Sequence, residues 1–273
     1  MTFILARRLA LLAPCLALAA PAQAATTQLA AHRAVYELSL LKSSGTNAPT
    51  QARGRIAFDF TGSSCDGYVQ NFRQITELQP SEGQARMTDM RSATFEGGDG
   101  KDYRFKVTTS VGPGRSEDVD GRAKKAGAEV AIDLAKPKHT HVALAGPALF
   151  PTEHVRHILA AAQAGEHILE TKVYDGSGDG EKVFDTLAVI GKQRATPATE
   201  KAVQIDALKG LRRWPVAISY FEPNKRDGQP VYILSFDLYE NGVSRALNLD
   251  YGDFSLKGEM TELTMLPAST CAK

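Results

Sequence analysis

The sequence lacks the short motifs that mark common nucleophilic and nucleotide-binding active sites. It contains no G-x-S-x-G, so the nucleophile elbow of the usual hydrolases has no candidate serine. It also contains no G-x-x-x-x-G-K-[ST] and no G-x-G-x-x-G, so nothing points to a bound nucleotide or other cofactor. We therefore predict a protein that is not an enzyme and has no cofactor. A glycosidase-like pair of carboxylates leaves no motif, and that alternative stays open.

An excess of charge of one sign is also missing. Lysine and arginine number 32, aspartate and glutamate number 31, and the formal net charge is +1. A nucleic-acid-binding protein usually carries a basic patch that shows as an excess of positive charge. The balance therefore predicts no nucleic-acid partner.

No apolar run reaches the length of a membrane-spanning helix. The longest begins after Arg7 and Arg8, covers about 12 residues and leads to small residues that end at Ala24, whereas a bilayer span needs roughly 20 apolar residues. This pattern predicts a signal peptide over residues 1–24, export to the periplasm and no stable membrane insertion. A lipoprotein site ending at Cys15 is the less favoured alternative, because a proline precedes that cysteine.

Cysteine is scarce, with three residues in the whole chain. Cys15 falls in the predicted signal peptide, which leaves Cys65 and Cys271 near opposite ends of residues 25–273. An isolated pair in an oxidising compartment usually forms a disulfide. We predict this bridge, although two unrelated thiols remain the alternative. No linker divides the chain, so residues 25–273 are predicted to form a single domain.

Short segments of alternating apolar and polar residues run through the chain, and turn residues separate most of them. Predicted strands cover 33–41, 53–60, 68–78, 86–96, 102–110, 129–134, 167–174, 182–191, 214–221, 231–240, 243–251 and 254–266. The Asn241–Gly242 pair predicts a hairpin, and Gly258 suggests a bulge in the last strand. Residues 121–129 are expected to form an exposed turn. The pattern indicates a mostly β, antiparallel architecture.

One segment predicts a helix, at 152–164. Thr152 is a residue type that favours the N-cap, an apolar stripe follows at helical spacing, and Gly165 is a stop signal. We expect this helix to pack against the sheet.

The stretch VYDGSGDGEKVFDT, residues 173–186, resembles the start of a calcium loop. Asp175 and Asp179 fall at its first and fifth places, but Thr186 stands where a bidentate carboxylate is required. Asp and Gly also favour tight turns. A hairpin between two strands is therefore the preferred interpretation. An irregular calcium site with Asp175, Asp179 and Asp185 stays open.

Two histidine pairs are weak candidates for metal ligands. His154 and His157 lie three residues apart on the predicted helix, whereas zinc enzymes use four-residue spacing with a glutamate between the histidines. His139 and His141 alternate on an extended segment, and nothing in the sequence brings the pairs together. We predict a surface or capping role for each pair and no metal site.

Several segments together resemble the EipB family of periplasmic cell-envelope integrity proteins. They are LAAHRAVYELSL, CDGYVQNFRQ, PTEHVRHILAAAQAGE leading into VYDGSGDG, and WPVAISYF before FDLYENGVSRALNLDYGDFSLKGEMTELTML. The resemblance implies a β-spiral, an open, barrel-like winding of antiparallel strands around one helix. It also implies a disulfide between Cys65 and Cys271, and it identifies no catalytic residue.

The sequence and the resemblance lead to one favoured function and two alternatives. The favoured one is a non-enzymatic periplasmic protein that maintains the cell envelope by binding a protein, a lipid or a peptide. The expected contact surface is the concave face of the sheet against the 152–164 helix. The alternatives are a periplasmic hydrolase of cell-wall or lipid material and a periplasmic carrier of lipids or lipoproteins.

Overall fold

A computed structural model describes residues 28–45, 48–112, 114–223, 228–269 and 271. The predicted signal peptide, residues 1–24, lies outside the described residues. Within the part of the chain that the structure describes, no helix is long and apolar enough to cross a membrane.

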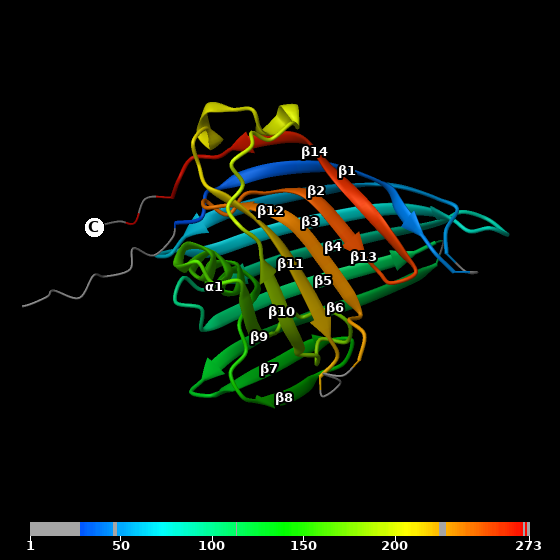
Figure 1. The fold of residues 1–273 in the computed structure, drawn as a ribbon. Coiled ribbons are helices and arrows are strands. Elements are labelled where there is room, and N and C mark those ends of the chain that lie inside the picture. Colours follow the sequence, from blue (N-terminus) through cyan, green and yellow to red (C-terminus); the bar gives the residue numbers. More distant parts are fainter. Residues whose placement is uncertain (1–27, 46–47, 113, 224–227, 270, 272–273) are drawn as a thin grey trace, which may run out of the picture.

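The described residues form one 14-stranded antiparallel sheet that winds around a single α-helix (Figure 1). The strands are β1 His32–Ser43, β2 Gln51–Ser63, β3 Gly67–Gln79, β4 Arg86–Glu96, β5 Asp102–Val111, β6 Arg115–Ala126, β7 Glu129–Lys136, β8 Thr140–Ala145, β9 Ile168–Val173, β10 Phe184–Ile190, β11 Arg213–Phe221, β12 Tyr232–Tyr239, β13 Ser244–Asp250 and β14 Phe254–Met265. The helix α1 covers Pro151–Ala164, and two 3₁₀ turns cover Lys201–Val203 (η1) and Asp206–Leu208 (η2).

The strand order shows how the two halves of the open sheet are joined. From one edge to the other it reads β8-β7-β6-β5-β4-β3-β2-β1-β14-β13-β12-β11-β10-β9. The first eight strands therefore lie side by side in chain order, the last six do the same, and the β1–β14 pair joins the two halves. The mostly β, barrel-like winding around one helix that the resemblance implied is thus confirmed.

The helix side of the concave face is filled by core. Ile158 and Leu159 of α1 are fully buried in a cluster that includes Trp214 and Val216 of β11. At period 2, the same face of β12 carries Tyr232, Leu234, Phe236 and Leu238, as predicted from the sequence. The contact between α1 and the sheet is therefore apolar and closely packed.

Three local predictions need correction. Residues 121–126 belong to strand β6, where they pair with both β5 and β7, so only the 127–128 turn remains of the predicted exposed turn. The N-cap of α1 is Phe150, and Thr152 lies inside the first turn. The predicted strands omit β8, and His141 lies in this strand, as its expected extended segment allows. In each case pairing with a neighbouring strand or a distant side chain outweighed the local sequence signal.

Other local predictions are confirmed. Gly165 ends the helix with φ 78°, a left-handed conformation that glycine adopts readily, and its amide bonds back to Ala162. Asn241–Gly242 forms the turn between β12 and β13. The register of β14 against β1 shifts between the pairs Val35–Glu262 and Tyr36–Met260, close to the predicted bulge.

Candidate functional site

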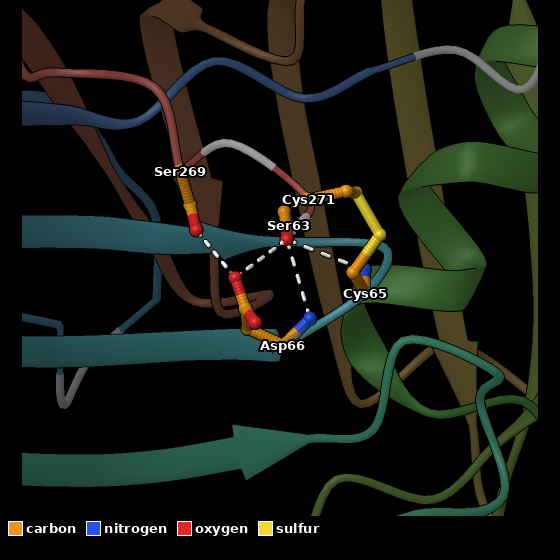
Figure 2. Close-up of a disulfide and its surroundings, with 5 residues drawn as sticks. All are labelled: Ser63, Cys65, Asp66, Ser269 and Cys271. Carbon is orange, nitrogen blue, oxygen red and sulfur yellow. Dashed lines mark hydrogen bonds between the residues drawn. A yellow bond between two sulfur atoms is a disulfide. The ribbon is translucent and has the colours of Figure 1, made fainter. Parts of the chain in front are cut away.

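The C-terminal segment is fastened to the turn between β2 and β3 by a disulfide between Cys65 and Cys271 (Figure 2). The two Cα atoms lie 5.6 Å apart across a sequence separation of 206 residues. Asp66 supports the junction, because its carboxylate accepts hydrogen bonds from the hydroxyls of Ser63 and Ser269. These two bonds, that from Ser269 first, lower the pKa of Asp66. The disulfide therefore holds Cys271 against the β2–β3 turn of the sheet.

The first turn of α1 is held by a glutamate from a distant strand. Glu96, at the end of β4, accepts hydrogen bonds from the backbone amides of Thr152 (2.7 Å) and Glu153 (2.8 Å). It therefore satisfies amides that no helix can satisfy from within. Its carboxyl is buried, and burial raises its pKa to about 7 although the two amide bonds act in the opposite direction. The sequence does not indicate this role of Glu96, because no local pattern marks a cap that comes from another strand.

The two histidines of α1 lie in different environments, one buried and one exposed. His154 is 3% exposed, and its Nε2 atom has no hydrogen-bond partner among the described residues. Burial, with a smaller contribution from His157, lowers the pKa of His154 to about 4. His157 is exposed and borders a cavity of about 500 Å³ beside β9 and β10. The predicted surface or capping role is therefore wrong for His154, which is a buried core residue.

The 174–183 segment connects β9 to β10, which pair as an antiparallel hairpin. Asp175 accepts a hydrogen bond from the amide of Ser177 (2.9 Å), and Asp179 accepts one from the amide of Glu181 (3.1 Å). Both carboxylates thus serve turns of their own backbone. Asp185 instead forms an ion pair with Lys172.

None of the candidate metal ligands assembles into a cluster. Across the described ranges, no group of three or more His, Cys, Asp or Glu side chains could hold a metal ion. His141 pairs with Asp133 on the outer strands, away from the helical pair. The sequence candidates Asp175, Asp179, His154 and His157 thus do not converge.

Five aromatic rings form a continuous arc across β10–β14, toward the end of the sheet where the β13–β14 turn lies. They are Phe184 of β10, Tyr220 of β11, Tyr232 of β12, Tyr251 after β13 and Phe254 of β14. Successive ring centroids lie 6.0, 5.9, 5.1 and 5.0 Å apart. Gln74 of β3 reaches the hydroxyl of Tyr251 from the opposite half of the winding, at 3.4 Å. We call these five rings the aromatic arc.

The same end carries a rim of exposed apolar side chains. β1 and β5 end there, β4 and β12 begin there, and the β13–β14 turn lies there. The rim consists of Leu41, Met87, Val111, Val231 and Tyr251, with exposed fractions from 38% to 54%. Apolar side chains gathered from several turns on one rim are typical of a contact surface. The sequence shows the alternation within each strand, but only the register brings these residues together.

Comparison with known proteins supports one family. The model of the EipB-like family matches residues 23–267. The cell envelope integrity protein EipB of Brucella abortus is 38% identical over 245 residues, which cover 89% of this chain and 87% of that protein. The crystal structure of a beta-barrel-like protein from Brucella abortus superposes with a TM-score of 0.82 at 37% identity, covering 88% of this chain and 100% of that chain. The chain therefore belongs to the EipB-like family.

Proposed function

We propose that this chain is an exported periplasmic protein, with residues 25–273 as a single domain, that maintains cell-envelope integrity by binding a partner. The observation that carries the proposal is the 38% identity to the Brucella abortus cell envelope integrity protein over most of both chains. The proposal treats the protein as non-enzymatic, in keeping with the missing nucleophile and nucleotide motifs. The partner is a protein, a lipid or a peptide.

The aromatic arc and its rim are the proposed contact surface. Ile158 and Leu159 of α1 are committed to the core, whereas the rim side chains are exposed. Tyrosine combines an apolar ring with a polar tip, which suits a surface that receives an amphipathic partner. The contact is therefore proposed at the aromatic arc and its rim, and not at the packed surface of α1.

The hydrolase alternative is less well supported. A catalytic site would need strongly perturbed titratable groups in an open pocket. Glu96 and His154, whose pKa values burial shifts strongly, are both 3% exposed and pack in the interior. Glu96 already accepts bonds from two backbone amides of α1.

The test complements a strain that lacks this gene with the wild-type chain and with two double variants. Leu41→Ser with Val231→Ser removes two rim side chains, which are 54% and 46% exposed. Ile168→Ser with Val189→Ser is the matched control, because those residues are 62% and 48% exposed but belong to β9 and β10 outside the rim. Resistance to detergent is measured, with periplasmic protein levels checked by immunoblot.

We expect the wild type and the control to restore resistance and the rim variant to fail at equal protein level. If the rim variant restores detergent resistance as well as the wild type does, the rim is not the contact surface. Failure of the wild type would refute the envelope role itself. Mass spectrometry of material that co-purifies with the wild type then separates a lipid from a protein partner.

A further inference from the structure

A second pocket lies on the outer side of β10–β13, on the opposite face of the sheet from α1. It measures about 590 Å³. Its floor includes Pro215 and Ala217, which alternate along β11 with the core residues Val216 and Ile218. Its roof is residues 194–199, part of the 191–212 segment that leaves the sheet between β10 and β11 and carries η1 and η2 (Figure 1). We call it the arginine pocket.

Three guanidinium groups converge in this pocket on a single aspartate. Asp237 of β12 accepts hydrogen bonds from Arg245 Nη1 at 2.7 Å and from Arg213 Nε at 3.3 Å. Arg194 approaches its other oxygen at 3.5 Å. The side chains of Arg213 and Arg245 are only 9% and 10% exposed, whereas that of Arg194 is 50% exposed.

The pocket carries more positive charge than its own carboxylates neutralise. Glu200 pairs with Arg245 and also accepts the backbone amide of Met260 at 3.1 Å. Three guanidinium groups therefore face two carboxylates, which leaves one positive charge in excess. Arg194 contributes this excess from the accessible side of the pocket.

The backbone next to Arg245 is strained. Asp237 lies opposite Arg245, while Ser235 lies opposite Asn248, so β13 contains an extra residue between these pairs. Ala246, which follows Arg245, has φ 51°, the left-handed conformation that alanine rarely adopts. Strained backbone of this kind is common beside binding sites. The contacts of Glu200 and Arg213 hold the 191–212 segment against the sheet, which accounts for these two residues. The half-exposed Arg194 is not needed for that purpose.

We propose that the arginine pocket binds a phosphate group. Arginine forks suit phosphate oxygens, and the half-exposed Arg194 presents its guanidinium group from the accessible side of the pocket. Thr199 and Ser235, each of which carries a hydroxyl, also line the pocket. A phosphodiester carries one negative charge and matches the excess. The phosphate belongs either to a free ion or to an anionic lipid headgroup.

The test is calorimetric titration of the purified protein with sodium phosphate and, separately, with short-chain phosphatidylglycerol below its micelle concentration. Arg194→Ala removes the accessible guanidinium and leaves the buried network in place. Arg55→Ala is the control, because Arg55 is an exposed arginine of β2 that pairs with Glu37. Thr199→Val removes a lining hydroxyl with little change of shape. Melting temperatures of all variants establish that they fold.

We expect saturable binding by the wild type and by Arg55→Ala, and at least tenfold weaker binding by Arg194→Ala. Thr199→Val should weaken binding severalfold. Binding of phosphate alone indicates a free ion, and binding of phosphatidylglycerol alone indicates a lipid headgroup. The proposal is overturned if neither probe binds saturably, or if Arg194→Ala binds as well as the wild type.

Discussion

The carboxylate of Glu96 in β4 and the backbone amide of Thr152 in α1 are joined by a buried hydrogen bond of 2.7 Å across 56 residues of sequence. This bond, with its neighbour to Glu153, belongs to the polar contacts between the first half of the sheet and the helix, which also include Gln70 with Thr152 and Lys125 with Glu153. It also makes the start of α1 sensitive to pH, because the carboxyl that caps it is buried.

Replacement of Glu96 by glutamine should remove a pH dependence of stability. The pKa of Glu96 is raised from 4.5 to about 7, and burial is the main cause. The folded state thus favours the protonated carboxyl, so this stabilisation is complete below pH 4.5 and is lost as pH rises through 7. The loss amounts to about 3 kcal/mol at most. Urea unfolding should be measured between pH 4 and pH 8. The unfolding free energy of the wild type minus that of Glu96→Gln should fall as pH rises through 7. A flat difference would contradict the prediction.

His154→Leu should have the opposite pH signature. The pKa of His154 is lowered from 6.5 to about 4, chiefly by burial, so the stabilisation is complete above 6.5 and is lost as pH falls toward 4. At pH 7 the variant should be as stable as the wild type or more stable, since the leucine leaves no unpartnered ring nitrogen. Thermal melts at pH 5 and pH 7 measure both effects. A large loss at pH 7 would show that the imidazole has a partner.

Cys65→Ser and Cys271→Ser should each lower the melting temperature. The bridge closes a loop of 206 residues, and chain entropy limits its contribution to about 5 kcal/mol. Reductant should lower the melting temperature of the wild type to that of the variants and leave the variants unchanged. Unchanged melting in both single variants would mean that the bridge adds no stability.

Ala246→Gly should raise the unfolding free energy by about 1 kcal/mol, because glycine adopts the left-handed conformation without the steric cost that alanine incurs. Ala217→Gly is the matched control. Ala217 pairs with Ser235 in regular strand, so glycine there should destabilise by roughly 0.5–1 kcal/mol. Chemical denaturation of the two variants tests the prediction, which fails if both lose stability.

Millimolar calcium should leave the melting temperature unchanged. Asp175 and Asp179 already accept backbone amides of their own turns, and they do not assemble with a third carboxylate. Differential scanning fluorimetry with calcium and with a chelator measures this. A clear stabilisation by calcium would restore the irregular calcium site.

Much of the local structure follows from the sequence alone. Alternation predicts the strands, Asn241–Gly242 predicts a hairpin, and Gly165 predicts the end of the helix, because these signals act between residues that are near in the chain. The exceptions arise where pairing with another segment outweighs the local signal. Residues 121–126 look like a turn, but pairing with β5 and β7 makes them a strand.

The amino-acid sequence alone predicts the strand-rich architecture and its single helix, because apolar periodicity and turn-forming residues depend only on neighbours in the chain. Only the tertiary structure decided which residues meet across the sheet. Glu96 bonds to α1, the ring of Tyr232 contacts that of Tyr251 at a tilt, and Arg245 lies opposite Asp237 beside a bulge. These contacts depend on strand order and register, and a shift of one residue would turn each side chain to the opposite face.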